Sequence, residues 1–145
     1  MFAQNDRSNY KLNIDQRDVG RLHDTIIFEK KYLVSYIKVK LSNNSAKALK
    51  YITYSCSWDE LFHVDNKAIK VCMQPCDKNV PIIESLEAHK STEFILPVTI
   101  ESKTSNLWFK VGMNLFLAND SSKGTFLLPV ENLNNVIWSN QIQLP

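Results

Sequence analysis

Three cysteines and a histidine lie within one central stretch of this 145-residue chain: Cys56, His63, Cys72 and Cys76. Thiolate and imidazole groups are the ligand set of structural zinc sites. The spacing here is C-x6-H-x8-C-x3-C, whereas such sites are usually marked by paired C-x2-C motifs. We therefore predict no metal and no cofactor, and these four residues are only the metal-ligand candidates that the chain offers.

The same cysteines allow a disulfide instead. Cys56 and Cys76 stand at the ends of predicted strands that lead into and out of a short crossover, so we favour a bond between them if the protein is exported. In the loop-entropy model, closing that span contributes about 3 kcal/mol to stability. Pairing of Cys56 with Cys72, or three reduced cysteines, stays open because a sequence does not determine which cysteines pair.

Polar residues around His63 suggest other chemistry. A cation site, or an acid–base pair with the histidine, would use Asp59, Glu60, Asp65 and Asn66. Calcium loops place acidic ligands at alternating positions with a glycine and a distal glutamate, and that glycine is absent here. Helix capping and a solvated turn therefore explain these residues more simply.

Catalysis by a serine nucleophile also lacks a motif. Ser55 and Ser57 lie near His63 in sequence, but the chain has no G-x-S-x-G elbow, and proximity in sequence gives no geometry. Phosphate-binding loops, G-x-G-x-x-G and H-E-x-x-H are absent as well. We predict that the protein is not an enzyme. A metal-dependent enzyme built around Asp59, His63 and Asp65 is the remote alternative.

The composition is that of an ordinary globular protein. Apolar residues make up 44% and charged residues 22% of the chain, and the net charge of +2 comes without a long basic run, so we expect no nucleic-acid partner. The apolar runs are too short for a transmembrane segment. We expect an N-terminal extension or edge strand over residues 1–24 and a single β-sandwich domain over residues 25–145. Nothing in the sequence indicates the oligomeric state.

The N-terminus gives a cue to location. Met1, Phe2 and Ala3 are apolar, and polar residues follow from Gln4 onward. This pattern fits the end of a signal segment followed by a polar mature start, although an ordinary N-terminus explains it too. We therefore predict a secreted or periplasmic protein, with a cytoplasmic one as the alternative.

Alternating apolar residues predict about eight β-strands, and no helical period is sustained. The clearest strands cover residues 32–41, 92–101 and 107–117. Pro81 and Pro97 lie within predicted strands, so the first is expected on an edge and the second facing outward or at a bulge. These features predict an all-β fold.

One short helical turn is expected near residues 57–63. Ser57 and Glu60 have the spacing of a capping box at its start. Trp58 then follows the cap, and we expect its ring to close one end of the core.

Four aromatic residues fall on strand faces that are expected to point outward: Tyr36, Tyr54, Trp108 and Phe116. An exposed aromatic patch would bind a protein or a glycan, whereas packing beneath a loop would give these rings a purely structural role. Asn43 and Asn119 each match the acceptor pattern for N-glycosylation.

Three segments follow a strand-and-turn pattern that is common in β-sandwiches: residues 37–45 (IKVKLSNNS), 86–91 (LEAHKS) and 92–100 (TEFILPVTI). The pattern resembles that of immunoglobulin-like domains of small exported bacterial proteins, and bacterial proteinase-inhibitor-like sandwich families share the layout. The resemblance covers about residues 32–117. It implies a two-sheet antiparallel β-sandwich and no functional residue, and the Cys–Trp–Cys pattern of antibody domains is absent.

We therefore expect a non-enzymatic, exported β-sandwich that binds a protein or glycan or serves as an accessory module. The alternative is a cytosolic inhibitor or immunity-type protein that binds a protein partner through loops or an edge strand. Reduced cysteines and a genuine start at Met1 would favour that alternative.

Overall fold

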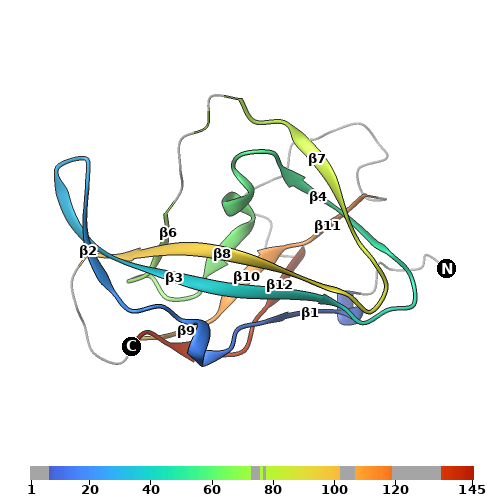
Figure 1. The fold of residues 1–145 in the computed structure, drawn as a ribbon, viewed down its shortest axis with the longest axis horizontal. Helices are drawn as coiled ribbons and strands as arrows, with labels where there is room; N and C mark the ends of the chain where they lie inside the picture. Colours follow the sequence, from blue (N-terminus) through green and yellow to red (C-terminus); the bar gives the residue numbers. More distant parts are fainter. Residues whose placement is uncertain (1–6, 73–75, 77, 102–106, 119–134) are drawn as a thin grey trace.

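The computed structural model of the chain describes residues 7–72, 76, 78–101, 107–118 and 135–145. These residues form an all-β structure of antiparallel strands and short 3-10 turns (Figure 1). A helix long and apolar enough to cross a membrane does not occur among them. The strands are β1 (Tyr10–Asn13), β2 (His23–Ile27), β3 (Lys30–Asn43), β4 (Leu49–Tyr54), β5 (Phe62–Val64), β6 (Lys70–Val71), β7 (Pro81–Leu86), β8 (Ser91–Ile100), β9 (Trp108–Phe109), β10 (Val111–Asn114), β11 (Phe116–Leu117), β12 (Val136–Trp138) and β13 (Ile142–Gln143).

The long strands β3 and β8 form the centre of the largest sheet. Its order is β1-β3-β8-β6, and β2 also pairs with β3. Along β3, the side chains of Ile37, Val39 and Leu41 are buried, whereas Tyr36 and Lys40 are exposed. This period of two is the alternation that the sequence predicted for residues 32–41, and it gives the sheet one core face and one wet face.

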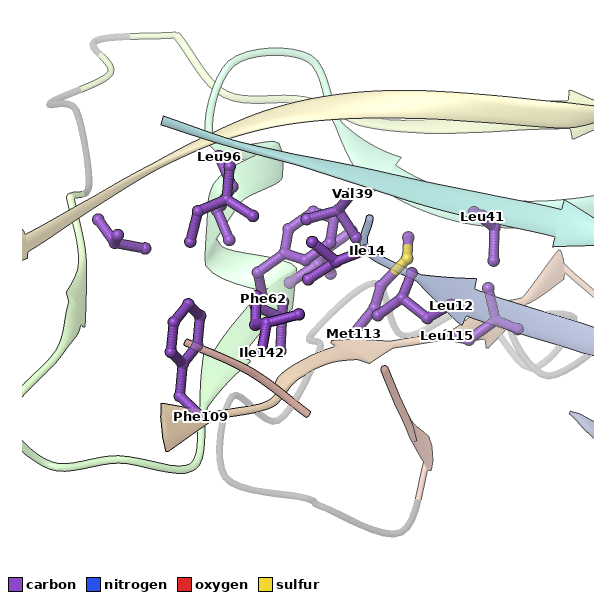
Figure 2. Packing of buried hydrophobic residues seen from close by; sticks show 14 of the residues in the cluster. Leu12, Ile14, Val39, Leu41, Phe62, Leu96, Phe109, Met113, Leu115 and Ile142 are labelled. Carbon is purple, nitrogen blue, oxygen red and sulfur yellow. The ribbon is translucent and has the colours of Figure 1, made fainter. Parts of the chain in front are cut away.

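The N-terminal segment belongs to the same sheet. β1 lies at the sheet edge and pairs with the end of β3. Leu12 and Ile14 are buried in the hydrophobic core, where Figure 2 shows Ile14 beside Val39 and Leu12 beside Met113. Gly20 then passes so close to β3 that a Cβ atom there would lie 2.8 Å from the carbonyl oxygen of Tyr36. The segment before the β2–β3 hairpin is therefore an edge element that completes the core.

Three smaller sheets have the orders β12-β10-β5, β11-β4-β7 and β13-β9. β7 begins with Pro81 and lies at an edge, as the sequence predicted. The sheets share one hydrophobic core, and Figure 2 shows Phe62, Phe109, Met113 and Ile142 gathered below β3 and β8.

The single strand predicted over residues 107–117 is wrong. The structure divides this stretch into β9, β10 and β11, which join three different sheets. Both faces of residues 111–117 are buried, so the stretch runs through the core, and each short piece pairs with a different neighbour. Gly112 permits this passage, because a Cβ atom there would lie 2.6 Å from Cγ1 of Val136.

The crossover after β4 contains a 3-10 turn, η3 (Trp58–Leu61). The predicted helical turn near residues 57–63 is therefore present but shorter, because β5 begins at Phe62. The capping box is wrong: the side chain of Ser57 makes no capping hydrogen bond, and its hydroxyl instead accepts one from Asn79 Nδ2. Trp58 packs as expected, with its ring centroid 5.9 Å from that of Phe62 and 5.8 Å from that of Phe94.

A disulfide links the two ends of this crossover. Cys56 is bonded to Cys76, the pairing favoured from the sequence, with 6.0 Å between the Cα atoms. Cys72 is half-buried and carries a free thiol. The bond fixes the chain on both sides of η3, and it constrains the unfolded state by about 3 kcal/mol in the loop-entropy model.

Candidate binding site

The residues proposed from the sequence as zinc ligands do not come together. Cys56 and Cys76 are consumed by the disulfide. His63 lies on β5, where its Nε2 atom is 2.6 Å from Nδ2 of Asn114. Within the described ranges, no group of three or more His, Cys, Asp and Glu side chains is arranged to hold a metal ion.

The acidic residues around His63 also diverge. Asp65 accepts a hydrogen bond from the backbone N–H of Lys110 at 2.7 Å, and Asn66 accepts one from Ala68 at 2.9 Å. Asp59 is buried in η3. Burial lowers the pKa of His63 from its ordinary value of 6.5. Asp65 and Asn66 thus bond to backbone groups, as expected for a turn.

Neither Ser55 nor Ser57 is placed to act as a nucleophile with His63. The hydroxyl of Ser57 is bonded to Asn79, and that of Ser55 accepts the backbone N–H of Val80 at 3.1 Å. The imidazole of His63 is hydrogen-bonded to the side chain of Asn114. A nucleophile–base pair needs a direct hydrogen bond between the two side chains, and these serines do not make one with the histidine.

The four candidate aromatic residues occupy different environments. Tyr36 is 54% exposed on the outer face of β3, and Trp108 is 50% exposed on β9. Phe116 is only 7% exposed, so its expected outward position is wrong. Its strand β11 pairs with β4 inside the core. Tyr54 is half-buried and, alone of the four, lines a groove.

That groove is the candidate binding site. It has a volume of about 520 Å³ and lies between the β4–β7 strand pair and the first half of β8. In Figure 1 these strands converge on the right of the molecule, away from the β2–β3 hairpin. Its walls are formed by Tyr51, Thr53, Tyr54, Ser55, Trp58, Ile82, Glu84, Thr92, Glu93, Phe94 and Ile95.

One wall is the inner face of β4 and β7. Tyr51 stands opposite Glu84, and Thr53 stands opposite Ile82, so strand register places these four side chains on one face. Burial, together with the nearby Glu84 carboxylate, raises the pKa of Tyr51 to about 12. The phenol therefore stays neutral and offers an O–H group at any physiological pH.

The opposite wall is the outward edge of β8. The backbone N–H of Cys72 donates to the carbonyl oxygen of Pro97 at 2.9 Å, so that carbonyl points away from β3. Because backbone groups alternate in direction, those of Glu93 and Ile95 point the same way. Among the described strands, β6 alone pairs with this edge, opposite Val98 and Thr99. The expectation that the backbone of Pro97 faces outward is confirmed.

The groove combines three kinds of contact. Its aromatic rings come from Tyr51, Tyr54, Trp58 and Phe94, and the charged side chains among its lining residues are all carboxylates, from Glu84 and Glu93. Unpaired backbone groups at a strand edge offer hydrogen bonds to an added strand. This arrangement can bind an extended chain that carries apolar and basic side chains.

Sequence reasoning missed most of this groove. Of its lining residues, only Tyr54 was assigned to a binding surface, and Trp58 was assigned to the core, against which it does pack. Ile95 was the available signal, because it is an isoleucine on the otherwise polar outer face of a clear strand, between Glu93 and Pro97.

Asn43 and Asn119 match the acceptor pattern for N-glycosylation, and the first of them lies among the described residues. Asn43 is fully buried, and its Nδ2 donates to the carbonyl oxygens of Lys47 at 2.8 Å and Leu86 at 3.0 Å. A glycan on that nitrogen would replace one of its two hydrogens, so at least one of these bonds would be lost, and a sugar has no room at a fully buried atom. Asn119 and the Met1–Ala3 cue lie outside the described residues.

In comparisons with known proteins, no protein-family model matches the chain, and no curated protein matches it significantly. Any functional conclusion therefore has to come from the geometry of the groove.

Proposed function

We propose that this protein is an exported, non-enzymatic binding module with an immunoglobulin-like β-sandwich fold, and that it binds an extended polypeptide segment in the groove between β8 and the β4–β7 pair. The observation that carries the proposal is the groove itself. It joins an outward strand edge, an aromatic floor and two carboxylates within one volume of about 520 Å³. An extended segment would use all three, by adding to the strand edge and placing alternate side chains in the groove.

The disulfide supports export. Disulfides such as Cys56–Cys76 form and persist in oxidising compartments and are rare in cytosolic proteins.

A cytosolic inhibitor or immunity-type protein is the second candidate. The outward edge of β8 favours it as well, because such a protein would bind its partner through an edge strand. Mass mapping of protein from its native host, alkylated without reduction, separates the two. A crosslinked Cys56–Cys76 peptide supports export, whereas three alkylated cysteines support the cytosolic protein.

Binding itself is tested on arrays of extended peptides and of glycans. We expect binding to peptides that combine basic and apolar residues. Glu84→Lys should weaken that binding about tenfold, because it reverses one of the two charges in the groove. Glu87→Lys is the matched control, since Glu87 is exposed just beyond the same strand and does not line the groove.

Three results would contradict the proposal. They are binding to neither array, binding to glycans alone, and binding to peptides that Glu84→Lys leaves unchanged. The first would remove the groove as a ligand site, and the second would change its ligand class.

A further inference from the structure

The turn of the β2–β3 hairpin carries an exposed aromatic residue in a strained conformation. Phe28 and Glu29 connect the strands, with backbone φ angles of 48° and 65°. A turn with positive φ at both central positions is normally built from Asn and Gly, because a Cβ atom is unfavourable there. Phe28 is nevertheless 93% exposed. Among the described residues, the ring of Phe28 is therefore left without a packing partner that would offset the unfavourable turn.

The residues on either side of this turn are apolar or basic. Ile26 is 68% exposed, and it stands opposite the exposed Lys31. Lys30 bonds to Glu101 at 3.0 Å and lies 5.5 Å from the ring centroid of Tyr32. Two large exposed apolar side chains beside a strained turn mark an interaction site. We use the name hairpin tip for residues 26–31.

The hairpin tip complements the groove in chemistry. The tip offers an aromatic ring, an exposed isoleucine and Lys31, and it is itself an extended two-stranded segment. Lys30 is paired with Glu101, and Glu29 is the one acidic residue of the tip.

The groove offers aromatic rings, a strand edge and the carboxylates of Glu84 and Glu93, of which Glu93 already lies 3.9 Å from Nζ of Lys38. Glu84 is therefore the main negative charge that a guest segment would meet. Ring-to-ring contacts and opposite charges are therefore available on the two surfaces.

The two surfaces lie at opposite ends of β3. Lys30 begins the strand at the tip, whereas Val39 and Lys40 pair with Phe94 and Glu93 beside the groove. Nine to ten residues of extended chain span roughly 30 Å. Figure 1 shows the hairpin projecting at the left end of the molecule and β4 and β7 on the right. The tip therefore cannot reach the groove of its own chain.

We propose that the hairpin tip of one copy docks into the groove of a second copy, with Phe28 against the aromatic rings and Lys31 near the carboxylates. This inference rests on the proposed function, since it names the polypeptide segment that the groove binds. The two contact surfaces differ, so the contact is heterologous, and each added copy leaves one free tip and one free groove. The product is a head-to-tail chain of copies and not a closed pair.

Sedimentation equilibrium on the full chain tests this assembly. The contact is small, so we expect dissociation constants on the order of 0.1–1 mM. The weight-average mass should rise from 16.7 kDa past the dimer mass as concentration increases. Phe28→Asn should abolish the rise without lowering the thermal unfolding midpoint, because Asn accepts a positive φ. Ile83→Ser is the control, because it also removes a large exposed apolar side chain. Ile83 lies outside the groove and the tip, so this variant should assemble normally.

Mixing two variants gives the decisive result. Phe28→Asn keeps its groove, and the double variant Glu84→Lys with Glu93→Lys keeps its tip, so each alone should remain monomeric. Their mixture should form a complex that stops at one copy of each, because only one tip and one groove are functional.

Several outcomes would overturn the inference. They are a wild-type chain that stays monomeric to about 1 mM, assembly that survives Phe28→Asn, and variants whose mixture remains monomeric. If the wild-type chain is monomeric yet binds array peptides in a Glu84-dependent way, the second-copy inference fails and the proposed groove function stands.

Discussion

The crossover after β4 and the hairpin between β2 and β3 both connect strands, but they are built in opposite ways. The crossover is closed by the Cys56–Cys76 bond and packs Trp58 against two phenylalanines. The hairpin turn has positive φ at Phe28 and Glu29 and exposes its aromatic ring. The first connection is stabilised from within the monomer. The second leaves its ring exposed on a turn with positive φ, which is the contact that we propose a second copy makes.

The largest expected effect tests the disulfide that closes the crossover. Replacing Cys56 and Cys76 by alanine should lower the free energy of unfolding by about 3 kcal/mol, because the unfolded chain regains the entropy of an open loop. Denaturant unfolding followed by Trp fluorescence measures the change. Cys72→Ala is the control and should cost far less, since that thiol makes no crosslink. Equal losses of unfolding free energy in the two variants would show that the disulfide adds no stability of its own to the crossover.

Asn79 tests the hydrogen bonds that hold the same connection. Its Oδ1 accepts the backbone N–H of Cys56 at 3.4 Å and of Ser57 at 3.3 Å, and its Nδ2 donates to the Ser57 hydroxyl. Asn79→Ala should lower the free energy of unfolding by about 1 to 2 kcal/mol. The neighbouring Lys78→Ala, on an exposed residue, should change it little. A loss below the error of chemical denaturation would mean that the disulfide alone fixes the crossover.

The hairpin turn should respond with the opposite sign. Phe28→Asn combined with Glu29→Gly should raise the free energy of unfolding by about 1 kcal/mol, because both residues accept a positive φ. Thermal unfolding at low protein concentration, where copies do not associate, measures the gain. Destabilisation by this pair would show that the native turn is not strained, and it would remove the contrast with the crossover.

The smallest expected effect lies at the end of the crossover, at His63. Burial lowers the pKa of this side chain below 6.5, so the unfolded state takes up the proton first as pH falls. The stability contributed by the neutral ring is therefore fully present above pH 6.5 and is lost as pH falls through the lower folded pKa. We expect less than about 1 kcal/mol across that window. Denaturant unfolding between neutral and mildly acidic pH should show the loss, and His63→Gln should remove it.

The sequence predicted the long strands well because their alternation is regular. Ile37, Val39 and Leu41 repeat with a period of two, and β3 follows that period throughout. The same rule failed over residues 107–117, where alternation continues but both faces are buried from Val111 onward. A buried stretch can pair in several sheets, and alternation does not say which. Phe116 was misplaced for this reason.

The groove and the hairpin tip escaped prediction for different reasons. The walls of the groove come from β4, β7, η3 and β8, and their proximity follows from strand pairing that the sequence does not specify. At the tip, Phe28 and Glu29 occupy positions where Asn and Gly normally signal a turn. Because Phe28 and Glu29 are not typical turn residues, the sequence does not indicate a tight turn at this position.

Pro97 has a consequence for solubility. A strand that adds to the outward edge of β8 can accept and donate hydrogen bonds at Glu93 and Ile95. At Pro97 the nitrogen carries no hydrogen, and the carbonyl oxygen already accepts the backbone N–H of Cys72. Edge-to-edge growth of sheets, the route to fibrillar aggregates, needs an unbroken ladder. β8 can therefore pair with a short added strand, and Pro97 limits how far the ladder of hydrogen bonds extends.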